Sequence, residues 1–182
     1  MTTETNEEIC WFVMRDLKRP NAKMPAYRQL SQEGFEVFTP FETKIVTNHG
    51  KRTKVTVPVI RDLLFVHSSH NLLDSTVQRT DTLQYRYKKG GAYCEALVVP
   101  TREMEQFMQV VNSGAKVKYY QPEEITPDML GANIRILAEG PLYGTEGRLR
   151  SLRGSKKKRL IVELTGVLAV EVEVLPDFIE LI

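Results

Sequence analysis

A chain of 182 residues has room for one ordinary domain or two small ones. Hydrophobic residues make up 42% of it and charged residues 26%, which is ordinary for a globular protein and excludes the intrinsically disordered class. The formal net charge is only +2, but the cations are concentrated in particular segments, so binding to nucleic acid is not excluded.

The first residues, Met1 to Glu8, are polar and acidic, with no cationic stretch followed by an apolar one. They predict neither a signal peptide nor a membrane span, so we expect a cytoplasmic monomer. Cys10 and Cys94 lack metal-ligand spacing and are expected to be small buried hydrophobes. His67 and His70 have no third ligand nearby, and the sequence predicts neither a metal site nor a cofactor.

The amino-terminal part begins with a continuous apolar run, Ile9 to Met14, which is typical of a central strand covered on both faces. A helix is expected next, capped by Asn21 and ended by Gly34, and a strand follows at 35–40.

Residues 42–57 predict an exposed β-hairpin that turns at Asn48–Gly50. Lys51, Arg52 and Lys54 follow the turn, and Glu42 stands at the base. Two interpretations weigh equally: a charged edge that prevents aggregation, or a basic ribbon that contacts nucleic acid.

Further apolar runs at 58–66 and 96–100 predict two more strands, with a short helix at 71–77 between them. Core residues with helical spacing predict a helix that ends at Gly114; they are Met104, Phe107, Met108 and Val111. This order predicts an α+β domain over 9–118, with helices packed against its sheet. The proline-containing, acidic stretch 119–128 is interpreted as a linker.

The remaining residues, 129–182, predict a small closed β-barrel. Leu160, Val162 and Leu164 alternate with polar residues, as is typical of half-buried strands. The same alternation in the next strand places Glu171 and Glu173 on the solvent side. A tight loop precedes these strands, and we expect its glycines to serve backbone geometry. The loop contains Gly140, Pro141, Gly144, Glu146 and Gly147.

This loop between alternating strands resembles the KOW motif of ribosomal proteins and NusG-type transcription factors. Nearly the whole chain resembles the NusG superfamily, through its Trp11–Met14 strand, Phe38–Pro40, the basic hairpin and Leu64–Val66. Residues 98–107 and 174–179 are most similar to the UpxY-type antiterminators of capsular polysaccharide operons. One turn departs from the family pattern: Arg61–Leu63 stands where Pro-Gly-Tyr or Pro-Asn-Tyr is common.

The resemblance implies an amino-terminal NusG-like domain that binds the large subunit of RNA polymerase, followed by an SH3-like KOW barrel. The protein would then suppress pausing or termination, for a particular polysaccharide operon. Positions that match the family's polymerase contacts are Ile60, Leu63, Tyr85, Ser75 and Thr76, and we expect Tyr85 to expose its ring. Lys51, Arg52 and Lys54 would lie near DNA.

A second basic stretch, Arg148 to Arg159, could meet nascent RNA, a ribosomal protein at the barrel, or only water. One relative's carboxy-terminal domain also forms a helical hairpin, but β-branched residues predict that 160–174 stays β here.

Two other interpretations remain open at this point. The chain could be a general NusG-like factor that bridges polymerase and ribosome, or a KOW-containing ribosomal protein or RNA chaperone. An enzyme is not expected, because no nucleophile setting and no glycine-rich phosphate loop is present.

Overall fold

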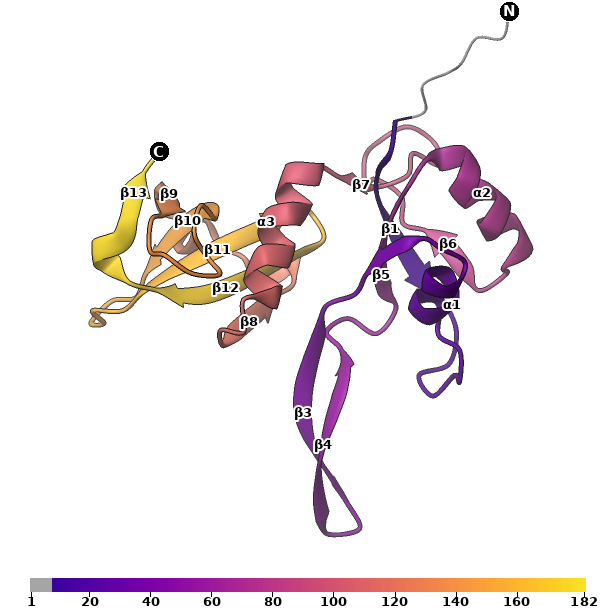
Figure 1. Ribbon diagram of the computed structural model, residues 1–182, viewed down its shortest axis with the longest axis horizontal. Coiled ribbons are helices and arrows are strands. Elements are labelled where there is room, and N and C mark those ends of the chain that lie inside the picture. Colours follow the sequence, from indigo (N-terminus) through magenta and orange to yellow (C-terminus); the bar gives the residue numbers. More distant parts are fainter. Residues whose placement is uncertain (1–7) are drawn as a thin grey trace, which may run out of the picture. The chain divides into compact units, whose positions relative to one another are not determined.

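The computed structural model describes residues 8–182, which form two units that divide between Val99 and Pro100 (Figure 1). The elements of the first unit are β1 (Cys10–Asp16), α1 (Ala26–Gln32), β2 (Glu36–Phe38), β3 (Phe41–Asn48), β4 (Lys51–Pro58), β5 (Leu63–Ser68), α2 (His70–Arg79), β6 (Leu83–Tyr85) and β7 (Val98–Val99). Those of the second are α3 (Thr101–Asn112), β8 (Val117–Tyr120), β9 (Asn133–Ile136), β10 (Glu146–Ser151), β11 (Lys158–Leu164), β12 (Leu168–Val174) and β13 (Ile179–Leu181). The mixed α/β content agrees with the expected class.

The sheet of the first unit is antiparallel, in the order β2-β5-β1-β6, with β7 also paired to β1. The central place of β1 confirms the prediction from its continuous apolar run. Alternate residues of β1 and β5 point to one face, where Phe12 and Val66 pack with Leu30 of α1 and Leu73 of α2. The opposite face is also buried, and there Trp11 stacks on His67 with ring centroids 4.7 Å apart.

The helix α1 begins later than the sequence indicates. Asn21 does not cap it; instead the Asp16 carboxylate, at the end of β1, accepts a hydrogen bond from the Ala26 N–H at 2.7 Å. The helix therefore takes its N-terminal partner from a strand, which sequence spacing cannot show. Gly34 ends it as expected, with φ of 93°.

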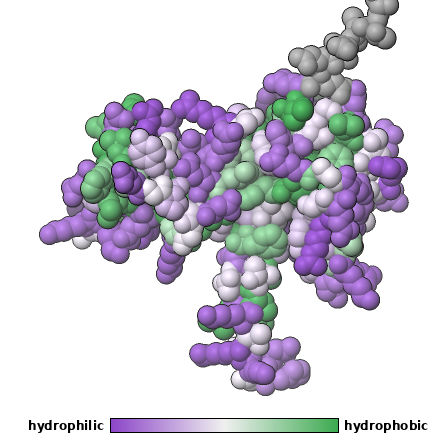
Figure 2. Space-filling model, in the orientation of Figure 1, coloured by the Kyte–Doolittle hydropathy of each residue, from purple (hydrophilic) through white to green (hydrophobic). Residues whose placement is uncertain are grey.

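The strands β3 and β4 form a separate two-stranded ribbon, paired from Phe41–Pro58 to Asn48–Lys51. The turn is one residue shorter than predicted, because only His49 and Gly50 lie between the strands, with φ of 47° and 77°. Two successive positive φ values suit a tight hairpin turn that follows the strand twist. Along the ribbon, apolar and strongly polar surface alternate (Figure 2).

The second unit contains a six-stranded antiparallel sheet in the order β13-β9-β10-β11-β12-β8, and α3 packs against β11 and β12. The strands β11 and β12 confirm that 160–174 is β. Tyr119 and Tyr120, placed in the linker by the sequence, belong to β8, which pairs with β12. Closure into an SH3-like KOW barrel and the boundaries 9–118, 119–128 and 129–182 stay predictions.

Among the described residues, no helix is both long enough and apolar enough to span a membrane.

Candidate functional site

The three apolar residues matched to polymerase contacts differ in exposure. Leu63 is 2% exposed and Tyr85 8%, while Ile60 is half-buried. The expectation that Tyr85 shows its ring is therefore wrong. The ring lies between the sheet and α2, stacked on His70 at 5.4 Å, and its hydroxyl donates to Asp74 Oδ1 at 2.7 Å. Burial, reinforced by this hydrogen bond, raises the pKa of the Tyr85 phenol.

Ser75 and Thr76 lie inside α2, in agreement with the short helix predicted at 71–77. The Ser75 hydroxyl donates to the Leu72 carbonyl within the helix, at 2.9 Å. Thr76 is only 2% exposed. Of these two, Ser75 alone presents a side chain to solvent.

A recess of about 350 Å³ lies at the base of the β3–β4 ribbon and contains one of the predicted contacts, Leu63. Its apolar walls include Pro25, Tyr27, Pro58 and Val59. Cations line it as well: Lys18, Arg19, Lys44 and Arg61. Such a recess suits apolar anchor residues of a partner whose flanking residues are acidic.

The segment before α1 is held in place beside this recess by hydrogen bonds. The Asp16 carboxylate accepts from the Lys18 N–H at 3.0 Å as well as from Ala26. The Lys18 ammonium donates to the Met24 carbonyl at 2.9 Å and to Gln29 Oε1 at 2.7 Å. Sequence reasoning missed this wall, since its residues come from an irregular segment without periodicity.

The turn that departs from the family pattern is also fixed. Asp62 accepts from Arg15 Nε at 3.0 Å and from Arg86 Nη2 at 3.1 Å, so a residue of β1 and the residue that follows β6 hold its carboxylate. Arg61, beside it, stays exposed and lines the recess.

The three cations that follow the turn of the ribbon, Lys51, Arg52 and Lys54, are all exposed but do not share one face. Arg52 lies opposite Thr47 and Lys54 opposite Ile45, and these four side chains occupy one face. Lys51 lies on the other. Ile45, an apolar residue that is 65% exposed, stands among these cations. Both interpretations of the ribbon, as a charged protective edge and as a contact with nucleic acid, therefore remain open.

The loop that resembles the KOW motif serves backbone geometry, as expected. Gly140 and Gly144 have φ of 130° and 76°. A Cβ on Gly147 would meet the Ile161 carbonyl of the neighbouring strand, so only glycine allows this approach. Pro141 offers its carbonyl to Gln109 Nε2 at 3.1 Å.

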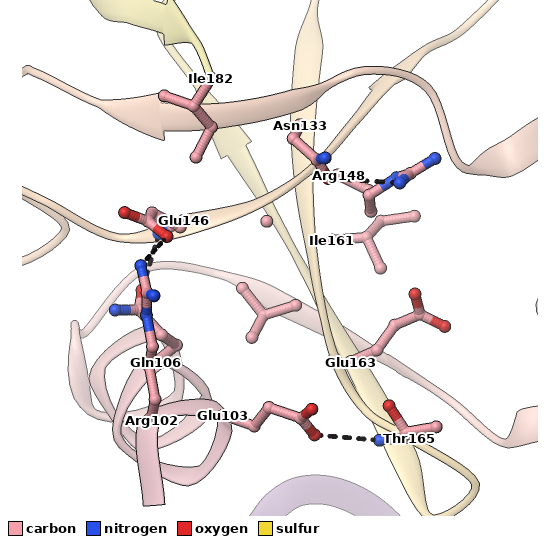
Figure 3. A pocket seen from close by; sticks show the side chains of 12 residues that line it. Arg102, Glu103, Gln106, Asn133, Glu146, Arg148, Ile161, Glu163, Thr165 and Ile182 are labelled. Atoms are coloured by element: carbon pink, nitrogen blue, oxygen red, sulfur yellow. Dashed lines mark hydrogen bonds and ion pairs between the residues drawn. The ribbon is translucent and has the colours of Figure 1, made fainter. Parts of the chain in front are cut away.

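Glu146 joins this loop to α3 (Figure 3). Its carboxylate binds Arg102 of α3 and, at 2.8 Å, Nη2 of Arg135, while its N–H donates to Gln106 Oε1 at 2.6 Å. The hydrogen bonds from Arg135, and then the charge of Arg102, lower the pKa of Glu146. Glu146, Arg102 and Gln106 line a cavity of about 480 Å³, and their mutual pairing marks it as structural.

Most of the basic stretch Arg148–Arg159 is engaged within the second unit. Arg150 and Arg159 bind the two oxygens of Glu171 at 2.6 and 2.7 Å. Glu171 is 3% exposed, so its predicted place on the solvent side is wrong. The face it occupies is covered by the 121–130 segment, whose Met129 packs with Tyr120, Ile161 and Ala169.

Cys94 also differs from expectation, since it is exposed while Cys10 is half-buried.

Comparison with known proteins identifies the family to which this chain belongs. The family model described as "Transcription termination factor nusG" matches residues 9–125. No curated protein sequence matches the chain. Among solved structures, it is similar to one described as "Domain interaction in Thermotoga maritima NusG", with 14% sequence identity, a TM-score of 0.44, and coverage of 96% of this chain and 98% of that one. Because the family model spans more than half of the sequence, the chain belongs to the NusG family of transcription elongation factors, whose members generally bind RNA polymerase.

Proposed function

We propose that this protein is a transcription elongation and antitermination factor that docks on the large subunit of RNA polymerase through its first unit. The observation that carries the proposal is the recess beside Leu63, with apolar walls and a cationic rim, inside the region matched by the family model. Docking there would keep the polymerase from pausing or terminating. The protein acts by binding and carries out no chemistry of its own.

The shape and charge of the recess fit a helical partner. Apolar side chains projecting from a coiled coil can enter the space beside Tyr27 and Val59, and acidic residues that flank them would meet Lys18 and Arg61. Leu63 forms part of the wall of the recess, because it is too deeply buried to insert into a partner. Ile60, which stands between the lining residues Val59 and Arg61, can add a contact at the margin of this surface.

The basic ribbon would lie near DNA while the first unit is docked. Lys51, Arg52 and Lys54 are exposed on a two-stranded element with no neighbouring strand among the described residues, which suits phosphate contacts that carry no sequence information. The likeness of residues 98–107 and 174–179 to the UpxY type supports a role in the transcription of one capsular polysaccharide operon. A ribosomal protein is the proposed partner of the second unit.

The proposal is tested by affinity capture of the full chain from native lysate, followed by quantification of polymerase subunits and ribosomal proteins. The double variant Val59→Glu, Ile60→Glu places acids at half-buried positions on the recess and beside it. We expect at least a fivefold loss of captured polymerase, because an interface anchor typically accounts for about 1 kcal/mol or more. Leu137→Glu, which changes an apolar residue of the second unit that is 44% exposed, is the matched control.

Thermal unfolding of both variants shows whether the fold survives. A stable double variant that captures as much polymerase as the wild type would refute the recess as the docking site. Capture of ribosomal proteins without polymerase would refute the function itself.

A further inference from the structure

A second charged depression lies wholly within the second unit, on the face of its sheet formed by β8, β11 and β12. We call it the cationic groove; it has a volume of about 570 Å³ and is lined by Lys116, Lys118, Lys157, Arg159, Glu171 and Glu173, with three small apolar residues. Strand register places these charges together, because Lys118 lies opposite Glu171 and Arg159 opposite Glu173.

The two acids of the cationic groove are already neutralised by neighbours. Glu171 binds Arg159 and Arg150, and Glu173 Oε2 binds the Lys157 ammonium at 3.0 Å. Among the described residues, no ion pair engages Lys116 or Lys118. The Lys118 ammonium instead lies 4.5 Å from the centroid of the Tyr120 ring. The groove therefore keeps an excess of positive charge that faces solvent.

The buried carboxylate of Glu171 holds the guanidinium of Arg159 in a fixed position. Burying a carboxylate is costly, and the cost is offset here by two charged hydrogen bonds and by the Tyr120 hydroxyl at 3.4 Å. Arg159 gives only Nη1 to Glu171, so its remaining N–H groups can donate to a ligand. A guanidinium fixed in this way matches phosphate geometry and loses little conformational freedom on binding.

From these features we infer that the cationic groove binds the backbone phosphates of single-stranded RNA. Its uncharged lining consists of Ala115, Val117 and Val172, which offers no pocket for the large anchor residues of a peptide. Glu173, whose side chain is 52% exposed, keeps Oε1 available as an acceptor for a ribose 2′-hydroxyl. DNA lacks that donor, so the groove should prefer RNA. This site lies outside the proposed polymerase recess and does not depend on it.

The test is fluorescence anisotropy of the full chain with a labelled single-stranded RNA, a DNA of the same sequence, and poly-glutamate. The variant Lys116→Glu, Lys118→Glu should bind the RNA about tenfold more weakly at low salt and flatten the dependence of log K on log[salt] by roughly 0.7 for each lost contact. The variant Lys23→Glu, Lys89→Glu changes the net charge equally at exposed positions of the first unit and is the control.

Each pair is also measured in the background Lys51→Glu, Arg52→Glu, Lys54→Glu, which removes the contribution of the ribbon. The tenfold loss should persist there, whether or not the ribbon binds DNA. Glu173→Ala should remove the preference for RNA over DNA without weakening DNA binding. Any of three results would overturn the inference. They are equal RNA affinity of the groove and control variants, equal binding of RNA and DNA by the wild type, and tighter binding of poly-glutamate than of RNA by the wild type.

Discussion

Replacement of Glu171 by alanine is expected to destabilise the second unit strongly. The side chain is 2% exposed and its two oxygens bind Arg150 and Arg159, whose side chains are 19% and 30% exposed. Removal of one partner from a buried ion pair typically costs about 3–5 kcal/mol, because the remaining charge stays buried without compensation. Here both guanidiniums reach some solvent, so we expect a smaller loss of roughly 2–3 kcal/mol.

Urea denaturation followed by far-UV circular dichroism measures this loss as a lower midpoint with an unchanged slope. A second variant separates lost charge pairing from lost volume: Glu171→Leu combined with Arg150→Met and Arg159→Leu removes all three charges at once. Since apolar replacement of a complete buried ion network is often neutral or stabilising, this triple variant should recover most of the stability. A loss below about 1 kcal/mol for Glu171→Ala, or a triple variant no more stable than the single one, would refute the role given to the network.

Two further predictions concern the ribbon and the KOW-like loop. Charge reversal of Lys51, Arg52 and Lys54 should weaken crosslinking to DNA and lower its salt dependence by roughly one unit for each lost phosphate contact, with the melting temperature unchanged; an unchanged salt dependence would leave the ribbon as a protected edge. Gly147→Ala should lower stability by about 1–3 kcal/mol in a denaturant titration, because the new Cβ would press on the Ile161 carbonyl and force the strands apart; a variant as stable as the wild type would show that the strands separate easily.

Local pattern predicted the elements of this fold well. The continuous run 9–14 became the central strand β1, and the alternation in 160–174 became β11 and β12. Gly34 and Gly114 end helices, each with positive φ. These features depend on a few neighbouring residues, so periodicity and backbone sterics are sufficient to predict them.

Burial of the candidate site residues could not be predicted in the same way. Alternation separates Glu171 from the core residues of β12, but the 121–130 segment covers the face on which Glu171 lies. Tyr85 likewise lies beside a basic residue in sequence, yet α2 brings His70 and Asp74 against its ring. In both cases a distant segment decides exposure, and nothing in the local pattern carries that information.

Long-range contacts, together with local propensity, also favour the β form of 158–174. In a helix, Ile161, Val162, Val170 and Val172 would each be disfavoured by roughly half a kcal/mol relative to alanine, and Gly166 by about 1 kcal/mol. Tertiary contacts strengthen this preference, because Glu171 on β12 meets Arg159 on β11 and Arg150 on β10 only while the three strands lie in register. A helix over 158–174 would separate β11 from β10 and leave these charges to find new partners. The ion network therefore makes the register of the sheet specific, whereas the β-branched residues alone would favour strands in any register.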